Sequence, residues 1–304
     1  QLDFHNSKTV MEKLFVGTAG WSYKDWVLSF YPQTQSSGFD WLEYYSEYFN
    51  VVEVNSSYYT YINPKIVDGW IKKVEGRDNF LFTIKLHQDF THKKKFSGEQ
   101  IQSIKSNLNK LNTENRLGGL LIQFPYSFVL NKENANHVKE LIDIFAGYEK
   151  FIEVRHKSWF IQRFFDFLEN NNSSLCTIDQ PAIGEAVEFK PVKAGQNLYI
   201  RFHGRNTKAW KESLGKFGKD QTYEQQSERY NYLYSPGELV EIEQKIKEVL
   251  DTVKKVFVIL NNHPKGNAVA NALELIHLLK ERIKVRVPET TLKAYPRLSK
   301  ISLN

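Results

Sequence analysis

Residues 151–155 read Phe-Ile-Glu-Val-Arg, a short apolar run with charged residues at alternate positions near its end. Side chains alternate between the two faces of a β-strand, so Glu153 and Arg155 share one face while Ile152 and Val154 share the other. The apolar face can pack against a helix, and the charged face can reach a polar site. The stretch therefore predicts a β-strand that carries functional residues at its carboxyl end.

Seven further runs of this kind occur along the chain. Each is rich in β-branched or aromatic residues, and most end in a charged residue, an amide or a histidine. The eight runs cover residues 15–19, 51–55, 81–87, 119–123, 151–155, 175–179, 199–203 and 256–263. Segments long enough for a helix separate them, and two begin with capping boxes, formed by Ser97 with Gln100 and by Ser235 with Glu238. Strands alternating with helices predict a parallel sheet, whose simplest closed form is a TIM (β/α)8 barrel.

The alternation of side chains also sorts the polar residues of the other runs. Polar residues two positions apart share a face, and we expect that face to point into the barrel. These pairs are Glu53 with Asn55, Lys85 with His87, Thr177 with Asp179, Arg201 with His203, and Asn261 with His263. Gln123 closes the fourth run. Because reactive residues of such barrels lie at the carboxyl ends of the strands, the pattern predicts an active-site rim.

Three carboxylates and three cations are predicted to face inward. They are Glu53, Glu153 and Asp179, and Lys85, Arg155 and Arg201. Barrel interiors often hold buried ion pairs, so Glu53 and Lys85, on adjacent strands, could simply be paired. The position of all six residues at strand ends favours a catalytic role. Glu153 and Glu53 are the preferred acid/base candidates, and Asp179 is a further catalytic candidate. Lys85 and His203 would stabilise oxyanion charge.

A metal site is the second interpretation of the same residues. Four of them offer ligands from consecutive strands: Glu153, Asp179, His203 and His263. Inward guanidinium groups at Arg155 and Arg201 oppose it, because they repel a divalent cation and prefer carboxylate or phosphate. The sequence also contains no nucleotide-binding glycine motif, serine elbow or HExxH. We therefore expect no metal and no cofactor.

The binding residues favour an anionic or hydroxyl-rich small molecule. Arginines suit carboxylate or phosphate, amides suit hydroxyl groups, and the aromatic loop of residues 20–26 can stack on a ring. Five of the eight histidines also lie at or just beyond strand ends. The substrate-binding candidates are Trp21, Tyr23, Asn55, His87, Gln123, Arg155, His156, Arg201, Arg205, Asn261, Asn262 and His263.

Composition limits the other possibilities. The chain has 304 residues, 41% of them hydrophobic, and no apolar stretch approaches the roughly 20 residues of a membrane span. Its single cysteine, Cys176, excludes an internal disulfide, and we expect it to be a buried core residue of a cytoplasmic protein. The net charge of +6 and the loop lysines 93–95 allow a nucleic-acid partner but do not favour one. No membrane partner is expected.

The chain is expected to form one domain. Residues 1–10 are polar and without periodicity, so we take them as a leader or an artificial extension, and residues 11–304 as the barrel. The longest irregular stretch, about 204–235, follows the seventh strand. It interleaves aromatic and basic residues, which fits either a lid over the substrate or a solvated insertion.

Five motifs, in order along the chain, carry a family resemblance. They are Gly17-Thr18-Ala19-Gly20-Trp21-Ser22-Tyr23, Val52-Glu53-Val54-Asn55-Ser56-Ser57-Tyr58-Tyr59, Glu153-Val154-Arg155-His156-Lys157-Ser158-Trp159, Arg201-Phe202-His203-Gly204-Arg205, and Asn261-Asn262-His263 with Gly266 and Asn267. From about Val16 to about Leu279 the chain resembles the YecE-like family, also called domain of unknown function 72. The resemblance implies a (β/α)8 barrel related to sugar isomerases, and it names no substrate. It implies that the site candidates above, apart from Trp21 and Tyr23, belong to the family's motif positions.

These observations lead to three hypotheses. The first is an enzyme that acts on a small sugar-like or anionic molecule by metal-independent acid/base chemistry, for which we expect Glu153→Gln to abolish turnover and spare the fold. The second is a metal-assisted phosphodiesterase or nuclease. The third is a barrel that binds a ligand without turnover.

Overall fold

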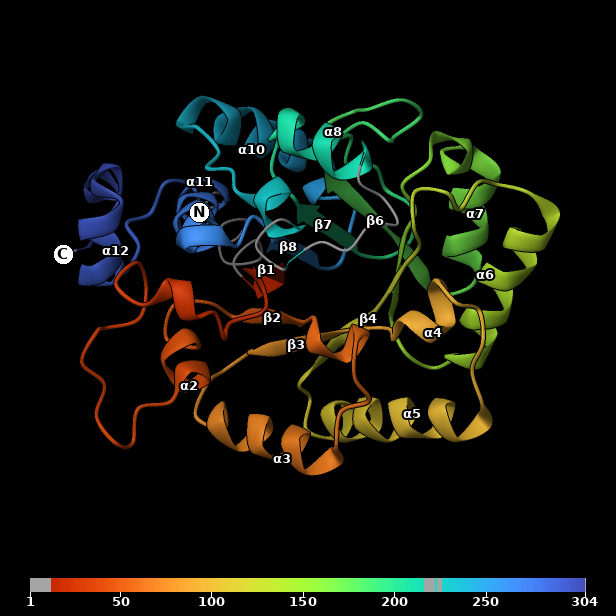
Figure 1. Ribbon diagram of the computed structural model, residues 1–304, viewed down its shortest axis with the longest axis horizontal. Helices are drawn as coiled ribbons and strands as arrows, with labels where there is room; N and C mark the ends of the chain where they lie inside the picture. The colour runs from red at the N-terminus through yellow and green to blue at the C-terminus, as the bar shows by residue number, and fades with distance from the viewer. Residues whose placement is uncertain (1–11, 216–221, 223–225, 304) are drawn as a thin grey trace, which may run out of the picture.

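The fold is a closed barrel of eight parallel strands, seen in a computed structural model that describes residues 12–215, 222 and 226–303. The strands are β1 (Leu14–Ala19), β2 (Val51–Val54), β3 (Leu81–Lys85), β4 (Leu117–Gln123), β5 (Lys150–Glu153), β6 (Ser173–Asp179), β7 (Leu198–Phe202) and β8 (Val256–Leu260). Each strand pairs with the next, and β8 pairs with β1 (Figure 1). The predicted TIM (β/α)8 barrel is confirmed. The expected leader, residues 1–10, lies outside the described residues.

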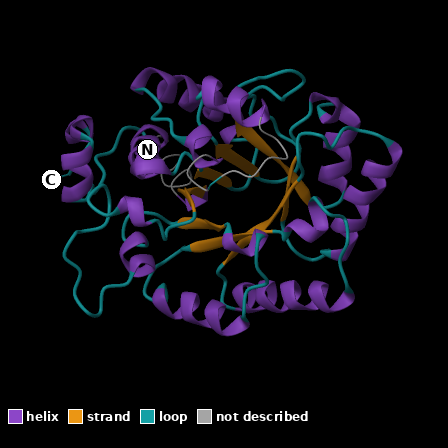
Figure 2. Ribbon diagram, in the orientation of Figure 1, coloured by secondary structure: helices purple, strands orange, loops and turns teal. Residues whose placement is uncertain are grey.

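Helices surround the barrel, as Figure 2 shows in purple around the orange strands. The longer helices are α3 (Pro64–Lys73), α5 (Gly98–Thr113), α6 (Lys132–Ile144), α7 (Gln162–Asn170), α10 (Pro236–Leu250) and α11 (Asn267–Leu279). The shorter ones are α2 (Trp41–Tyr45), α4 (Gln88–Thr91), α8 (Thr207–Gly215) and α12 (Glu289–Ala294). Residues 180–197, all of them described, join β6 to β7 without a helix.

Both predicted capping boxes are present. At the start of α5 the Gln100 amide N–H donates to Ser97 Oγ, and the Ser97 amide N–H donates to Gln100 Oε1. The same reciprocal pair joins Ser235 and Glu238 at the start of α10. These bonds satisfy amide groups that have no partner within the helix, and they fix where each helix leaves its loop.

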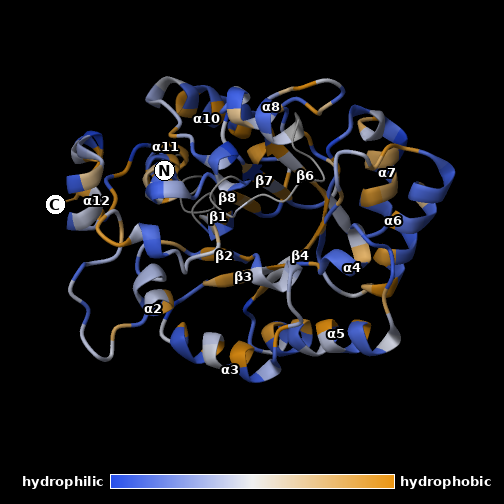
Figure 3. Ribbon diagram, in the orientation of Figure 1, coloured by the Kyte–Doolittle hydropathy of each residue, from blue (hydrophilic) through white to orange (hydrophobic). Residues whose placement is uncertain are grey.

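Two apolar layers follow from the alternation along the strands. Outward residues such as Val52, Ile152 and Phe202 pack into the large cluster beneath the helices. In Figure 3 the helices alternate between hydrophilic and hydrophobic colours along their length, as expected for helices with one face on a barrel. Inward residues form a second cluster, in which the rings of Phe15 and Phe257 stack at 5.1 Å. This cluster closes the barrel interior, and polar side chains continue it toward the carboxyl ends of the strands.

The connection from β7 to α10 carries the long insertion. Its described part contains α8 and the 3-10 helix η4 (Glu228–Tyr230), which contact each other. Residues of both elements reach the carboxyl end of the barrel, as the site below shows. Among the described residues, no helix combines the length and apolar character that crossing a membrane requires.

Candidate active site at the carboxyl end of the barrel

An ion network fills the upper barrel interior. Arg201 on β7 donates from Nη2 to Glu53 Oε1 at 2.7 Å, from Nε to Glu53 Oε2 at 2.9 Å, and from Nη1 to Glu153 Oε2 at 2.6 Å. Arg155 donates from Nη2 to Glu153 Oε1 at 2.7 Å. The side chains of Arg201 and both glutamates are at most 1% exposed. We call these four residues the inner network; it joins β2, β5 and β7, and its two carboxylates balance its two guanidinium groups.

The inner network keeps the Glu153 carboxylate charged. Burial alone would raise the pKa of Glu153, but the Arg201 and Arg155 guanidinium groups outweigh burial and hold that pKa well below its usual range. Glu53 also accepts a hydrogen bond from the Tyr199 hydroxyl at 2.8 Å. The pairing of Glu53 with Lys85, considered from the sequence, is absent among the described residues, because Arg201 and Tyr199 occupy that carboxylate.

His203 lies beside the inner network and is fully buried. Its Nδ1 is 2.9 Å from the amide nitrogen of Asn261, which donates to it and so leaves the imidazole hydrogen on Nε2. Nε2 has no hydrogen-bond partner among the described residues and is 3.9 Å from Glu153 Oε1. Burial, followed by the charge of Arg201, holds the pKa of His203 well below its usual range, so the ring is neutral.

A cavity of about 420 Å³ opens above the inner network. Its lining combines aromatic rings, amides and cations. The described lining residues are Tyr23, Asn55, Tyr58, Tyr59, Lys85, His92, Gln123, Pro125, Tyr126, Arg155, Arg201, Trp210, Ser213, Gln226, Ser227, Arg229, Tyr230, Asn261 and His263. Four of these side chains are lysine or arginine, and none of the lining residues in the described ranges is a carboxylate. We call this hollow the rim cavity; its charge favours an anion.

Lys85, at the end of β3, is the most unusual residue of the rim cavity. Its Nζ lies 4.1 Å from the centre of the Tyr58 ring and forms no hydrogen bond or ion pair with the described residues. Burial lowers the pKa of Lys85, the charge of Arg201 lowers it further, and the result is a pKa of about 7. The amine is therefore about half neutral at physiological pH.

The histidines of the rim cavity titrate in a different range. Burial lowers the pKa of His92 to about 4, assisted by the charge of Lys85, and burial lowers the pKa of His263 to about 4 as well. Both rings are neutral at pH 7. The His263 ring stacks on Tyr23 at 4.6 Å, with an angle of 6° between the planes. Of the lining groups with a shifted pKa, Lys85 is the one whose pKa lies near pH 7.

Asp179 corrects the sequence prediction, because it points out of the barrel. The strand register pairs Cys176 with Tyr199 and Asp179 with Phe202. Tyr199 belongs to the inner cluster and Phe202 to the outer one, and paired residues of parallel strands face the same side. Cys176 therefore takes the inward position, with its Sγ 3.8 Å from Glu153 Oε2, and its predicted place in the core is confirmed.

Asp179 belongs to a second network between the sheet and α10. Arg205 donates to it from Nε and Nη2, each at 3.0 Å, and the Tyr234 hydroxyl donates to its Oδ2. Arg205 Nη1 also reaches Glu238 Oε1 at 3.2 Å. We call Asp179, Arg205, Tyr234 and Glu238 the outer network. Arg205 was predicted to bind substrate. Its guanidinium instead pairs with Asp179 and Glu238, and it does not line the rim cavity.

Comparison with known proteins gives the family. The sequence pattern of the family described as Protein of unknown function DUF72 matches residues 15–294. The chain belongs to the DUF72 family. The resemblance carried by the five motifs is thereby confirmed. The DUF72 chain is 28% identical over 278 residues to the UPF0759 protein YunF of Bacillus subtilis (strain 168), covering 88% of this chain and 94% of that protein.

Solved structures of this family share the fold. A DUF72 family protein from Thermotoga maritima MSB8 matches with a TM-score of 0.75 and 29% identity, covering 88% of this chain and 99% of that chain. A DUF72 family protein from Enterococcus faecalis V583 matches with a TM-score of 0.72 and 26% identity, covering 88% and 95%. The names of these relatives state no reaction, so the chemistry rests on the residues of this DUF72 chain.

The structure brings most of the predicted site residues of this DUF72 chain together. Those that line the rim cavity are Tyr23, Asn55, Lys85, Gln123, Arg155, Arg201, Asn261 and His263. Those buried beside it are Glu53, Glu153 and His203. Gln123 donates from its amide to the Phe124 carbonyl at 2.9 Å. Asn55 Oδ1 is buried and has no hydrogen-bond partner among the described residues.

Besides Arg205, four predicted binding residues lie elsewhere, and each has a structural role. Trp21 packs edge-on against Trp70 of α3, with ring centres 5.6 Å apart. His87 and His156 each precede a helix, and their Nδ1 atoms accept the amide N–H two residues on, at 3.2 Å in both cases. Asn262 faces α11, where its amide donates to Asn271 Oδ1 at 2.9 Å. Our placement of these four at the rim cavity is corrected accordingly.

Sequence reasoning missed several cavity residues, above all Tyr58, Tyr126, Trp210, Arg229 and Tyr230. Three of them come from the insertion and form a stacked unit: the Arg229 guanidinium lies 5.3 Å from the centre of the Trp210 ring and 4.8 Å from the centre of the Tyr230 ring. The interleaving of aromatic and basic residues was the available signal. It could not show which of them reach the cavity.

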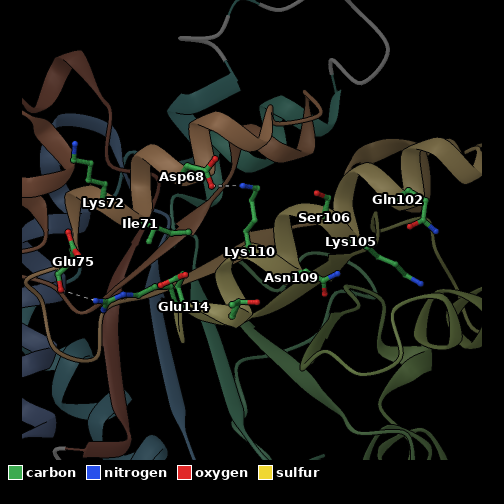
Figure 4. A pocket seen from close by; sticks show the side chains of 12 residues that line it. Asp68, Ile71, Lys72, Glu75, Gln102, Lys105, Ser106, Asn109, Lys110 and Glu114 are labelled. Atoms are coloured by element: carbon green, nitrogen blue, oxygen red, sulfur yellow. Dashed lines mark hydrogen bonds and ion pairs between the residues drawn. The ribbon is translucent and has the colours of Figure 1, made fainter.

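A larger hollow, about 800 Å³, lies outside the barrel between α3 and α5 (Figure 4). Three of its charged side chains are already engaged: Lys110 Nζ is 2.5 Å from Asp68 Oδ1, and Arg116 donates to the backbone carbonyl of Glu75 at 3.2 Å. It holds none of the strand-end residues. We therefore place the candidate active site in the smaller rim cavity.

Proposed function

We propose that this chain is an enzyme that acts on a small anionic, hydroxyl-rich molecule by acid/base chemistry in the rim cavity, with Lys85 as the group that transfers the proton. The observation that carries the proposal is the Lys85 amine, which lines the cavity without an ion-pair partner among the described residues. A general base works best when its pKa lies near the operating pH, and the pKa of Lys85 is about 7.

The glutamates support this chemistry rather than perform it. Both carboxylates are buried and fully engaged with guanidinium groups, and neither lines the cavity. Low pKa values make weak bases at neutral pH, which counts against the acid/base role that we preferred for Glu153 on sequence alone. In this proposal the inner network holds Arg201 and Arg155 in place.

The ligand class follows from the groups that lack partners. Arg155 pairs with Glu153 through Nε and Nη2, and its Nη1 has no hydrogen-bond partner among the described residues, so it can bind a carboxylate or phosphate. Asn55 Oδ1 is a buried acceptor that a ligand hydroxyl can satisfy. Tyr58, Trp210 and Tyr230 supply aromatic walls that suit a sugar-like body.

The metal-assisted alternative has less support, because its ligands are divided. Glu153 and His203 lie inside the barrel, Asp179 lies outside it, and His263 stacks on Tyr23. Within the described residues, no three histidine, cysteine or acidic side chains gather in a way that would hold a metal ion. For these residues to share a metal ion, the register of β6 would have to point Asp179 into the barrel.

Thermal unfolding in the presence of sugar phosphates, sugar acids and their neutral parent sugars tests the proposal. We expect the anionic compounds to raise Tm and the neutral parents to do so much less, with the gain lost in Arg155→Ala and kept in Arg286→Ala, a matched change of an exposed arginine. Compounds that bind are then followed by NMR for conversion. Equal stabilisation by neutral sugars contradicts the anionic class, and binding without any conversion favours the non-catalytic barrel.

A further inference from the structure

Lys85 offers chemistry that proton transfer alone does not use. Buried lysines are nearly always paired with a carboxylate, whereas this amine lies over the face of the Tyr58 ring, 4.1 Å from its centre. The carboxylates of Glu53 and Glu153 are close enough to influence it electrostatically, yet each is held by arginine. The amine is therefore free to react with a ligand in the rim cavity.

Two conditions make a lysine nucleophilic, and Lys85 meets both. One is removal from water and the other is a neighbouring cation, since each favours the neutral amine. Lys85 is partly buried, its amine is largely removed from water, and Arg201 and Arg155 are the cations beside it. Cys176, the only thiol, is not a competitor: it is 1% exposed beneath the network, and burial raises its pKa well above the usual range.

We propose that Lys85 forms a covalent imine with an aldehyde or ketone that carries a phosphate or carboxylate group. The inference rests on the function proposed above and narrows its substrate class to carbonyl compounds. It follows from the unpaired amine on β3, the cationic lining without a described carboxylate, and the free Nη1 of Arg155, all in one cavity.

The reaction is a condensation in which nothing is oxidised or reduced. The nitrogen lone pair of Lys85 forms a C–N bond while the carbonyl π pair moves to oxygen, which takes up one amine proton to give a carbinolamine. The C–O bond then breaks, and hydroxide leaves with the second amine proton as water. The nitrogen lone pair forms the C=N bond. The buried acceptor Asn55 Oδ1 lines the same cavity and suits the carbinolamine hydroxyl.

Borohydride trapping on the full chain tests the imine directly. The probes are dihydroxyacetone phosphate and pyruvate, with dihydroxyacetone as the neutral ketone and glycerol 3-phosphate as the anion without a carbonyl. Reduction fixes the imine as a secondary amine, so the chain gains the mass of the probe less one oxygen atom. Peptide mapping then locates the adduct.

We expect the adduct at Lys85, formed on the order of a hundred times faster at pH 7 than at the exposed Lys93. An ordinary lysine has less than about a thousandth of its amine free at that pH, whereas about half of the Lys85 amine is free. Lys85→Arg keeps the charge and should lose the adduct. Labelling spread evenly over exposed lysines, or absent altogether, overturns the proposal, and the map of the unaltered chain decides this even when the variant fails to fold.

Thermal shifts with the same probes separate this inference from the proposed function. Stabilisation by glycerol 3-phosphate without any adduct from either anionic ketone overturns the imine and leaves the anion-binding enzyme standing. No stabilisation and no adduct overturns both. An adduct at Lys85 that forms equally well with neutral dihydroxyacetone supports the nucleophile and overturns the requirement for an anionic group.

Discussion

The inner and outer networks are built from the same chemistry and lie at the same end of the barrel, yet only one borders a cavity. Each pairs carboxylates with arginine. The inner network takes them from β2, β5 and β7, across the barrel, and the outer network takes them from the ends of the neighbouring strands β6 and β7. The inner network lies under the rim cavity, whereas the outer network is covered by α10 and its preceding loop. Position at a strand end is therefore not enough to mark a site; the face of the strand decides.

The two networks also differ in how burial and charge balance. For Glu153 the arginines outweigh burial, and its pKa falls well below the usual range. For Asp179 burial outweighs Arg205 and Tyr234, and its pKa is raised. A carboxylate with a depressed pKa stabilises the folded chain at neutral pH, whereas one with a raised pKa does not. The inner network should consequently contribute more to stability.

Of the changes considered, Glu153→Gln should lower the free energy of unfolding the most. It leaves Arg201 and Arg155 with one carboxylate between them in a buried site, which costs about 3 to 5 kcal/mol of the free energy of unfolding. Our expectation from sequence, that this change spares the fold, is revised. The loss should be full above about pH 5 and shrink at lower pH, because the depressed pKa contributes stability only above the unfolded value of about 4.3.

Urea unfolding from pH 3 to pH 8 measures this loss. Glu185→Gln is the matched control, since that carboxylate is half exposed and pairs with Lys157 at the surface. It should change stability by less than about 0.5 kcal/mol. A Glu153→Gln chain as stable as the control would show that the inner network does not hold the barrel interior.

Lys85→Met should act in the opposite direction and stabilise the chain while abolishing turnover. The unfolded chain holds the proton of Lys85 up to about pH 10.5 and the folded chain only up to about pH 7, so this lysine penalises folding fully below pH 7. We expect a gain of roughly 2 to 4 kcal/mol at pH 6 that fades between pH 7 and pH 10.5.

The same unfolding series on Lys93→Met provides the reference, because the Lys93 side chain is 59% exposed and its partner Asp89 keeps hydrogen bonds from Tyr61 and Gln100. That variant should lie within about 0.5 kcal/mol of the unaltered chain at every pH. If the gain in Lys85→Met did not depend on pH, it would come from packing. The lowered pKa of the Lys85 amine would then be contradicted.

The sequence predicted the barrel and the inward position of the residues that form the inner network, because strand alternation has a strict period of two. That period places Glu53, Glu153 and Arg201 on the inner face without any knowledge of pairing. It could not place Asp179, since a polar residue on the outer face of a strand end looks the same as one on the inner face. The register of β6 against β7 decides this, and that register is a property of the closed barrel.

Ion-pair partners and loop contacts were also beyond the sequence. Glu53 pairs with Arg201 rather than with Lys85 of the adjacent strand, because the long guanidinium crosses the barrel interior. Trp210 and Tyr230 reach the rim cavity from the short helices α8 and η4 of the insertion, whose sequence has no strand alternation that tells inward from outward residues. Sequence therefore indicated the end of the barrel at which the rim cavity lies, whereas the unpaired amine of Lys85 became visible only in the fold.

Asp179→Asn should break the outer network with a smaller effect. Arg205 keeps Glu238 as a second partner and is about a quarter exposed, so its charge is not stranded, and the loss should be about 1 to 2 kcal/mol. Ligand-induced Tm gains in the rim cavity should remain those of the unaltered chain. If Asp179→Asn removed those gains while Glu153→Gln kept them, the functional face would be the outer one.

Arg229→Ala should have the smallest effect on stability and a measurable one on binding. Its guanidinium stacks on Trp210 and Tyr230, contacts worth about 0.5 to 1 kcal/mol, and it adds a cation to the rim cavity from the insertion side. We expect unfolding to change by less than about 1 kcal/mol and anion affinity to fall roughly fivefold, as titration calorimetry with the stabilising anion would measure. Arg229→Lys keeps the charge and should recover part of that affinity. If Arg229→Ala left the affinity unchanged, the anion would be bound by residues of the barrel strands, chiefly Arg155. The insertion would then line the rim cavity without binding the anion.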